Sequence, residues 1–231
     1  MEKAIITIHG IRWRSKKDWQ NEFGTCMKSK DAGLKVFHFR YGFLPAIMSY
    51  WFTATKFLKI HSWLLNFYVS RFISFNKKLR KKFPNCHFSV IAHSFGGWIL
   101  EHALAESEDL GFMNTVFVHC PISAHIENTS FWNWLEMNKI IRLFAWSSHN
   151  DPVIGTIAIK PFGQNGYWGF IRHSKAEDRI RPATKPYPIM LYNCHTTEEH
   201  SGIVENMEAY GQGLFRQLCG KGVDGVPKPQ K

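Results

Sequence analysis

The chain has 231 residues, 45% of them hydrophobic and 20% charged, which suits one domain with a sizeable core and excludes general disorder. Lys and Arg number 29 against 18 Asp and Glu, so the formal net charge is +11 with neutral histidines. This excess has two interpretations: a well-solvated basic surface, or attraction to anionic membranes, nucleic acid or acidic substrates.

The five cysteines are odd in number and widely spaced, and no two of them form a C-x-x-C pair. This pattern argues against a disulfide framework and against a zinc ribbon. The first apolar run, residues 4–8, is too short for the apolar core of a signal peptide. We therefore expect a reduced, cytoplasmic protein.

Six short apolar runs recur along the chain, separated by stretches long enough for helices. Most lack strict alternation, as expected of strands that are buried on both faces of a parallel sheet. The repeated order of strand, helix and strand predicts an α/β fold: a doubly wound, mostly parallel sheet of about six strands with helices on both faces. We expect a single domain over residues 1–220. The runs are residues 4–8, 35–41, 87–92, 115–119, 140–146 and 188–192.

The long gap between the second and third predicted strands is rich in aromatic residues. Because basic residues interrupt it, no stretch long enough to span a membrane is free of charge. Two amphipathic helices fit it better, as a helical insertion or cap at about residues 43–83. Its aromatics either wall an apolar acyl pocket or pack as ordinary core. Residues 221–231 have almost nothing to bury and predict a flexible tail.

The third predicted strand runs into Ile-Ala-His-Ser-Phe-Gly-Gly and then into a helical pattern, which places Ser94 at the apex of a sharp turn. Small residues stand two positions to either side, at Ala92 and Gly96. They are needed because such a turn brings the strand and the helix close together. The turn exposes the hydroxyl at the carboxyl end of the sheet and sets it at a helix N-terminus, where backbone N–H groups face developing negative charge.

This turn resembles the G-x-S-x-G nucleophile elbow of the α/β-hydrolase superfamily, with Ala92 in place of the first glycine. The first predicted strand ends in His9-Gly10, as in small serine esterases and lipases of that group. The resemblance implies an oxyanion hole made by the backbone N–H groups of Ile11 and Phe95. The resemblance does not give His9 a role in proton transfer.

A catalytic triad then needs an acid and a base further along the chain, in the order Ser, acid, His. Asp151 follows the fifth predicted strand directly and resembles the acid of the superfamily, whereas Asp178 is the less favoured alternative. His200 resembles the histidine just before the last helix, whereas His195 follows the sixth strand almost directly and is less suited to reach over the sheet.

The resemblance implies a serine hydrolase that cleaves a carboxylic ester, with a hydrophobic or lipid-like acyl group favoured. It requires no metal or organic cofactor, and we expect a small-molecule ester substrate, weak association with anionic membrane surfaces and no specific nucleic acid. Thioesters, amides and acyl transfer use the same groups, and the oligomeric state stays open. The alternatives are a membrane-surface binder and a regulatory protein that has the scaffold without turnover. Three residues are interpreted as strand-end packing rather than metal ligands: His119, Cys120 and His125.

Overall fold

A computed structural model describes residues 2–10, 18–40, 58–125, 131–137, 139–156, 165–170 and 190–220. Its centre is a six-stranded sheet in the order β2-β1-β3-β4-β5-β6, and every neighbouring pair is parallel. The predicted fold class is therefore confirmed. The strands are β1 (Glu2–Ile8), β2 (Lys35–Phe39), β3 (Cys86–His93), β4 (Phe112–Val118), β5 (Ile140–Ser148) and β6 (Met190–Thr196).

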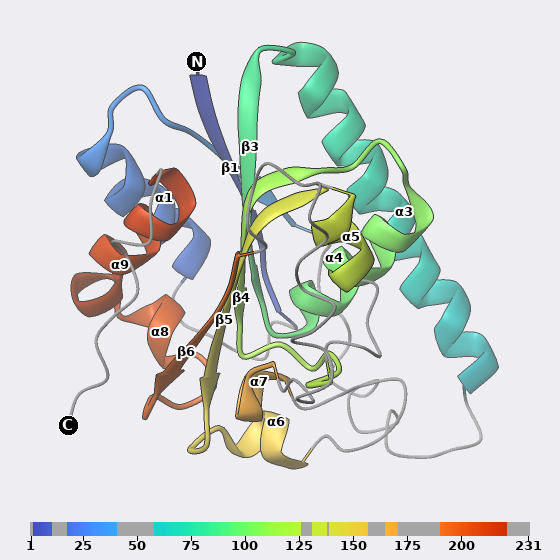
Figure 1. Cartoon of the computed structure of the whole chain (residues 1–231), viewed down its shortest axis with the longest axis vertical. Coiled ribbons are helices and arrows are strands. Elements are labelled where there is room, and N and C mark those ends of the chain that lie inside the picture. The colour runs from blue at the N-terminus through green and yellow to red at the C-terminus, as the bar shows by residue number, and fades with distance from the viewer. Residues whose placement is uncertain are drawn as a thin grey trace, which may run out of the picture.

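Helices cover both faces of the sheet (Figure 1). One layer holds α1 (Trp19–Lys30), α8 (Gly202–Glu205) and α9 (Met207–Cys219). The other holds α3 (Leu58–Lys82), α4 (Phe95–Glu106) and α5 (Phe131–Glu136). Two short helices, α6 (Pro152–Thr156) and α7 (Asn165–Trp168), lie at the end of the sheet where the strands finish.

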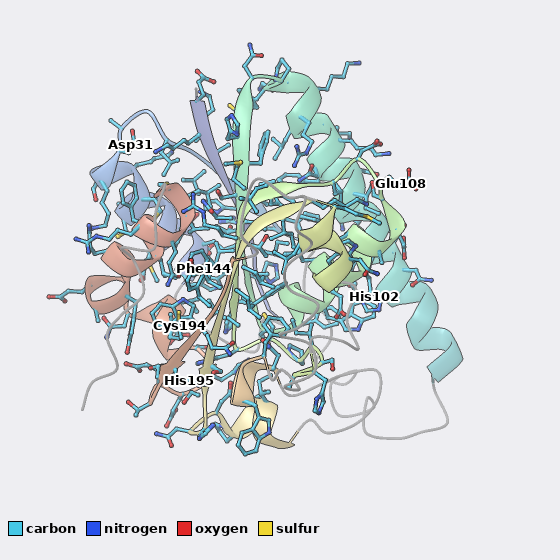
Figure 2. All side chains as sticks on the ribbon, in the orientation of Figure 1. Asp31, His102, Glu108, Phe144, Cys194 and His195 are labelled. Atoms are coloured by element: carbon cyan, nitrogen blue, oxygen red, sulfur yellow. The ribbon has the colours of Figure 1, made fainter. Side chains whose placement is uncertain are left out.

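The strands are continuous apolar runs because each face of the sheet borders its own hydrophobic core. Along β3, Val90 belongs to the core under α3 and α4, whereas its neighbour Ile91 belongs to the core under α1 and α9. Phe144 and Cys194 lie in the second core, between the sheet and the α1/α9 layer (Figure 2). The alternation places both faces of a strand in an apolar environment.

The aromatic-rich region at 43–83 is described from residue 58 onward, where it forms the single helix α3. Tyr68, Val69 and Phe72 are buried in the core, and α3 packs against α4 as a crossover helix. Among the described helices, none combines the length and the apolar character that a membrane crossing requires. Residues 41–57 and the predicted tail, 221–231, lie outside the described residues.

Candidate active site

Ser94 stands between the last residue of β3 and the first residue of α4. Its backbone has φ 52° and ψ −128°, a conformation that costs a non-glycine residue about 1–3 kcal/mol. The backbone N–H of Ser94 donates to the carbonyl of Val118 at 2.9 Å, which ties the turn to the neighbouring strand. The predicted strand, sharp turn and helix are therefore present, with the hydroxyl at the carboxyl end of the sheet.

Two glycines allow the chain to pack closely around this turn. A Cβ on Gly96 would lie 2.7 Å from the carbonyl oxygen of Ile8 and 2.8 Å from that of His9. A Cβ on Gly10 would lie 2.7 Å from the Cβ of Ser94. Both glycines thus allow the end of β1, with His9 and Gly10, to lie close to the turn that holds Ser94.

The side chains of Ser94, His200 and Asp151 form a continuous chain of hydrogen bonds. The hydroxyl of Ser94 donates to Nε2 of His200 at 2.8 Å, and Nδ1 of His200 donates to Oδ2 of Asp151 at 2.8 Å. With its proton on Nδ1, the imidazole of His200 has a free electron pair on Nε2 facing the serine. This is the tautomer that a general base needs.

Asp151 is fully buried just after β5, at the start of α6. Its second oxygen, Oδ1, accepts hydrogen bonds from the backbone N–H groups of Val153 and Ile154, each at 2.9 Å. Burial raises the pKa of Asp151, but the hydrogen bond with His200 and the backbone N–H groups outweigh it, and the net pKa lies below the ordinary value of 3.8. The carboxylate therefore stays ionised and orients the imidazole.

Two further histidines hold the backbone carbonyl of His200. Nε2 of His93 donates to this oxygen at 2.9 Å, and Nδ1 of His119 donates to it at 2.7 Å. Burial lowers the pKa of both imidazoles, so each is neutral and carries its single proton on the nitrogen that donates. Nδ1 of His119 also lies 3.5 Å from Oδ2 of Asp151.

His119 is interpreted from the sequence as a strand-end packing residue rather than a metal ligand, and the structure adds that its ring contacts the backbone carbonyl of His200 and the carboxylate of Asp151. His119 has φ 49°, which turns the chain at the end of β4 toward the site. In the structure β4 pairs with β3, so the residue that follows β4, His119, lies near the turn that holds Ser94. Nothing in the sequence indicates the unusual backbone angle or the orientation of the ring.

We compared the chain with known proteins. A scan against protein-family models and a search of the curated proteins found no match. Among solved structures, an uncharacterized protein from Bacillus cereus is 11% identical with a TM-score of 0.56, and the match covers 96% of this chain and 60% of that one. This chain thus spans less than two thirds of that protein's length.

Ser94 follows β3, Asp151 follows β5 and His200 follows β6, all strands of one parallel sheet. This is the chain order Ser, Asp, His of the α/β-hydrolase fold. The chain has the α/β-hydrolase fold. A second similar structure is the Francisella virulence factor BioJ, which is 13% identical with a TM-score of 0.49; the match covers 94% of this chain and 77% of that one. A third is a putative hydrolase of the α/β superfamily from Xanthomonas campestris, which is 9% identical with a TM-score of 0.48; the match covers 94% of this chain and 95% of that one.

The structure places the remaining predicted residues of the α/β-hydrolase site as follows. His195 lies at the end of β6 (Figure 2), where its Nδ1 is 2.8 Å from the hydroxyl of Ser147 rather than beside the nucleophile. Phe95 is the first residue of α4, so its backbone N–H belongs to the helix N-terminus. Ile11 and Asp178 lie outside the described residues.

Within the described residues, one group of three side chains has donor atoms close enough together for a metal ion: His119, Asp151 and His200. These are the same atoms that form the hydrogen bonds of the site. Ligands of one tetrahedral zinc ion lie about 3.3 Å apart, whereas Nδ1 of His200 and Oδ2 of Asp151 are separated by 2.8 Å. This distance fits a shared proton rather than a shared metal ion.

Proposed function

We propose that this protein is a serine hydrolase of the esterase or lipase type that cleaves a carboxylic ester through an acyl-enzyme on Ser94. The observation that supports it most is the pair of 2.8 Å hydrogen bonds linking Ser94, His200 and Asp151. A serine hydroxyl is a weak nucleophile until an adjacent base removes its proton. The strained turn that exposes this hydroxyl also supports the proposal, since such backbone conformations are frequent at active sites.

In the acylation step, Ser94 Oγ attacks the carbonyl carbon of the ester while Nε2 of His200 takes the hydroxyl proton. The carbonyl π bond opens to a tetrahedral oxyanion. Asp151 stabilises the imidazolium without becoming protonated, in keeping with its lowered pKa. The oxyanion then collapses, the bond to the alcohol oxygen breaks, and His200 returns its proton to the leaving alcohol.

In the deacylation step, His200 takes a proton from water as the water oxygen attacks the acyl carbon. The tetrahedral oxyanion then collapses, the bond to Ser94 Oγ breaks, and His200 returns the proton to Oγ, which releases the acid and restores the Ser94 hydroxyl. We assign the oxyanion hole to the backbone N–H groups of Phe95 and Ile11. Losing one such donor costs about 2.7–4 kcal/mol of transition-state stabilisation. No step requires a metal ion or an organic cofactor.

A hydrophobic acyl group is the substrate feature that we favour. Val153 and Trp168, on α6 and α7, are 41% and 45% exposed at the end of the sheet that holds Asp151. Apolar side chains beside polar catalytic groups are typical of sites for apolar ligands. Thioesters and amides would use the same machinery. A cytoplasmic location agrees with the five cysteines, all of which lie within the described part and are free thiols.

The test is the hydrolysis of p-nitrophenyl esters of increasing chain length by the wild type and three variants. Ser94→Ala and His200→Ala should each lower kcat by about 10⁶-fold, and Asp151→Asn by about 10⁴-fold. The matched control is His195→Ala, which should keep near-wild-type kcat because its ring bonds to Ser147 instead. Turnover that is unaffected by Ser94→Ala would contradict the proposal.

A non-catalytic role on the same scaffold is the alternative. It predicts no turnover of any ester in the panel and no reaction of Ser94 with acyl or phosphonyl reagents. The complete hydrogen-bonded triad favours the enzyme, because binding alone gives no reason for a buried carboxylate, an imidazole and a serine with a strained backbone to be aligned.

A further inference from the structure

Helix α3 has an unusual charge composition. Its 25 residues contain seven Lys or Arg and no Asp or Glu. The inner face of the helix is fixed in the protein, since Tyr68, Val69, Phe72 and Asn76 are buried. Most of the cations on the described side chains must therefore lie on the outer face.

Two of these cations, Arg80 and Lys77, have polar partners within the described residues. Arg80 turns inward, where Nε donates to Oδ1 of Asn76 at 2.6 Å and Nη2 donates to the carbonyl of Gly111. Lys77 forms an ion pair with Asp109 at 3.4 Å, and both side chains are more than half exposed. Exposed pairs of this kind contribute little to stability, so Lys77 remains accessible to another anion.

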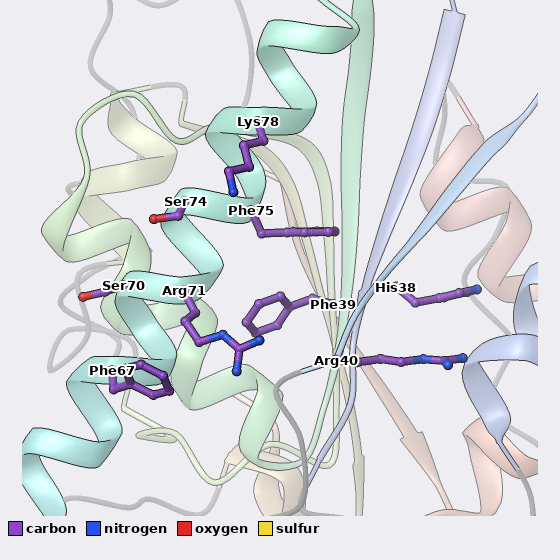
Figure 3. A pocket seen from close by; sticks show the side chains of 9 residues that line it. All are labelled: His38, Phe39, Arg40, Phe67, Ser70, Arg71, Ser74, Phe75 and Lys78. Carbon is purple, nitrogen blue, oxygen red and sulfur yellow. The ribbon is translucent and has the colours of Figure 1, made fainter.

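Two other cations of the outer face, Arg71 and Lys78, border a groove between α3 and the edge strand β2 (Figure 3). The groove has a volume of about 510 Å³. Figure 3 shows Arg71 and Lys78 on the α3 side and Phe39 and Phe75 beside them. Within the described residues, neither Arg71 nor Lys78 has a carboxylate partner. Lys81 and Lys82 continue the exposed basic surface toward the end of the helix.

Two other basic residues of the groove point away from it. His38 and Arg40 extend from β2 to the opposite side of the sheet (Figure 3). There Nδ1 of His38 lies 2.8 Å from the hydroxyl of Thr7, and Arg40 forms an ion pair with Asp18 at 2.9 Å. The positive charge available to a ligand in the groove thus comes from α3.

We propose that the outer face of α3 docks this protein onto the surface of an anionic phospholipid bilayer. Arg71 and Lys78 are seven residues apart, which places them two turns and about 10 Å apart along the same helix face. Phe67 lies one turn before Arg71, is 45% exposed and has the guanidinium 5.6 Å from its ring centroid. A row of cations with an aromatic ring at its end is the pattern that binds anionic headgroups at a membrane surface.

The aromatic rings decide between a bilayer and a nucleic acid as the occupant. Phe39 is almost fully buried and Phe75 half-buried in the groove, so they present a small apolar floor rather than an open platform on which bases can stack. Phe67 is exposed at the rim, where it can insert among lipid headgroups. The association is electrostatic, so it weakens as the salt concentration rises.

The experiment measures co-sedimentation of the full chain with phosphatidylcholine vesicles that contain or lack phosphatidylglycerol, at low and at high salt. The wild type should bind only the anionic vesicles, and only at low salt. Each basic residue near the surface contributes about a fivefold increase in affinity, so Arg71→Gln/Lys78→Gln should weaken binding about 25-fold. The charge-conserving pair Arg71→Lys/Lys78→Arg should retain it.

The matched control is Lys28→Gln/Lys30→Gln, which removes two exposed charges from the end of α1 on the opposite face of the sheet. It should bind as the wild type does. An equal loss in both double variants, no loss in either, or equal binding to neutral vesicles would overturn the proposal. Duplex DNA bound as tightly as the vesicles, with the same loss in Arg71→Gln/Lys78→Gln, would also overturn it. Ser94→Ala should bind vesicles normally, so this result is separable from the fate of the proposed hydrolase activity.

Discussion

Replacing His119 by leucine removes one of the two hydrogen bonds that hold the carbonyl of His200. The bond from His119 Nδ1 is the shorter of the two, at 2.7 Å, and the same nitrogen lies 3.5 Å from Oδ2 of Asp151. The carbonyl keeps its second donor, His93, at 2.9 Å. His200 is therefore expected to stay in the site but to lose its fixed position relative to the serine.

The size of the effect follows from this partial loss. A hydrogen bond of this kind contributes about 1 kcal/mol to stability when its partner group keeps another donor. Catalysis is more sensitive, because a shift of about 1 Å in a catalytic group can cost about 100-fold in rate. For His119→Leu we expect kcat to fall by about 10- to 100-fold, while KM stays within about threefold because His119 does not contact the substrate in the proposed mechanism.

His119→Asn is the matched variant, because the side-chain amide of asparagine can place an N–H close to the position of Nδ1. The other ring nitrogen of His119, Nε2, has no hydrogen-bond partner within the described residues, so asparagine gives up no bond there. This variant should recover kcat to within about fivefold of the wild type. The assay is steady-state hydrolysis of p-nitrophenyl butyrate, with thermal unfolding measured alongside. An unchanged kcat in His119→Leu, or equal losses in the leucine and asparagine variants, would refute the positioning role.

Three further predictions concern stability. Gly96→Ala should destabilise the fold by about 1–3 kcal/mol, because the new methyl group would lie 2.7 Å from the carbonyl oxygen of Ile8. A melting temperature no lower than that of the wild type would contradict this. Burial raises the pKa of Glu101 to about 7, so folding favours the protonated form and the stability of the fold decreases as the pH rises from 4.5 toward 7. Glu101→Gln should therefore raise the unfolding free energy at pH 8 by up to about 3 kcal/mol. The control variant Glu106→Gln, at an exposed position, should leave the unfolding free energy unchanged. Burial lowers the pKa of His93 well below 6.5, so stability should decline as pH falls below about 6.5, and His93→Gln should flatten this decline in melting temperature.

The sheet could be predicted from the sequence because its strands leave a strong local pattern. Strands buried on both faces are continuous apolar runs, and the predicted run at 140–146 lies within β5, Ile140–Ser148. The predicted ends of the strands were less accurate: β2 ends at Phe39, whereas the predicted strand covered residues 35–41. Strand ends depend on the pairing partner, and β2 ends three residues before the first turn-favouring residue, Gly42.

The sharp turn at Ser94 and the position of Asp151 at a strand end could also be predicted, since the turn restricts the residues that fit around it. Gly96 follows from close packing against β1, and Asp151 follows from its position directly after a strand. The sequence already favoured His200 over His195, from the resemblance of His200 to the histidine just before the last helix of the superfamily. His195 lies within β6, whereas His200 follows the strand, and the loop before α8 brings His200 back over the sheet to Ser94.

His93 and His119 show where local reasoning ends. They lie 26 positions apart in sequence, yet both donate to the same carbonyl oxygen, that of His200. The convergence depends on three strand ends meeting at one edge of the sheet and on the positive φ of His119. A lone histidine at a strand end is compatible with simple packing, so its role becomes visible only when side-chain orientations are known.

The most direct measurement is covalent labelling by a fluorophosphonate, read by mass spectrometry of the intact chain and of its proteolytic peptides. We predict one adduct per wild-type chain, carried by the peptide that contains Ser94, no adduct in Ser94→Ala, and much slower labelling in His200→Ala. Equal labelling of the wild type and Ser94→Ala, or an adduct on any other residue, would contradict it.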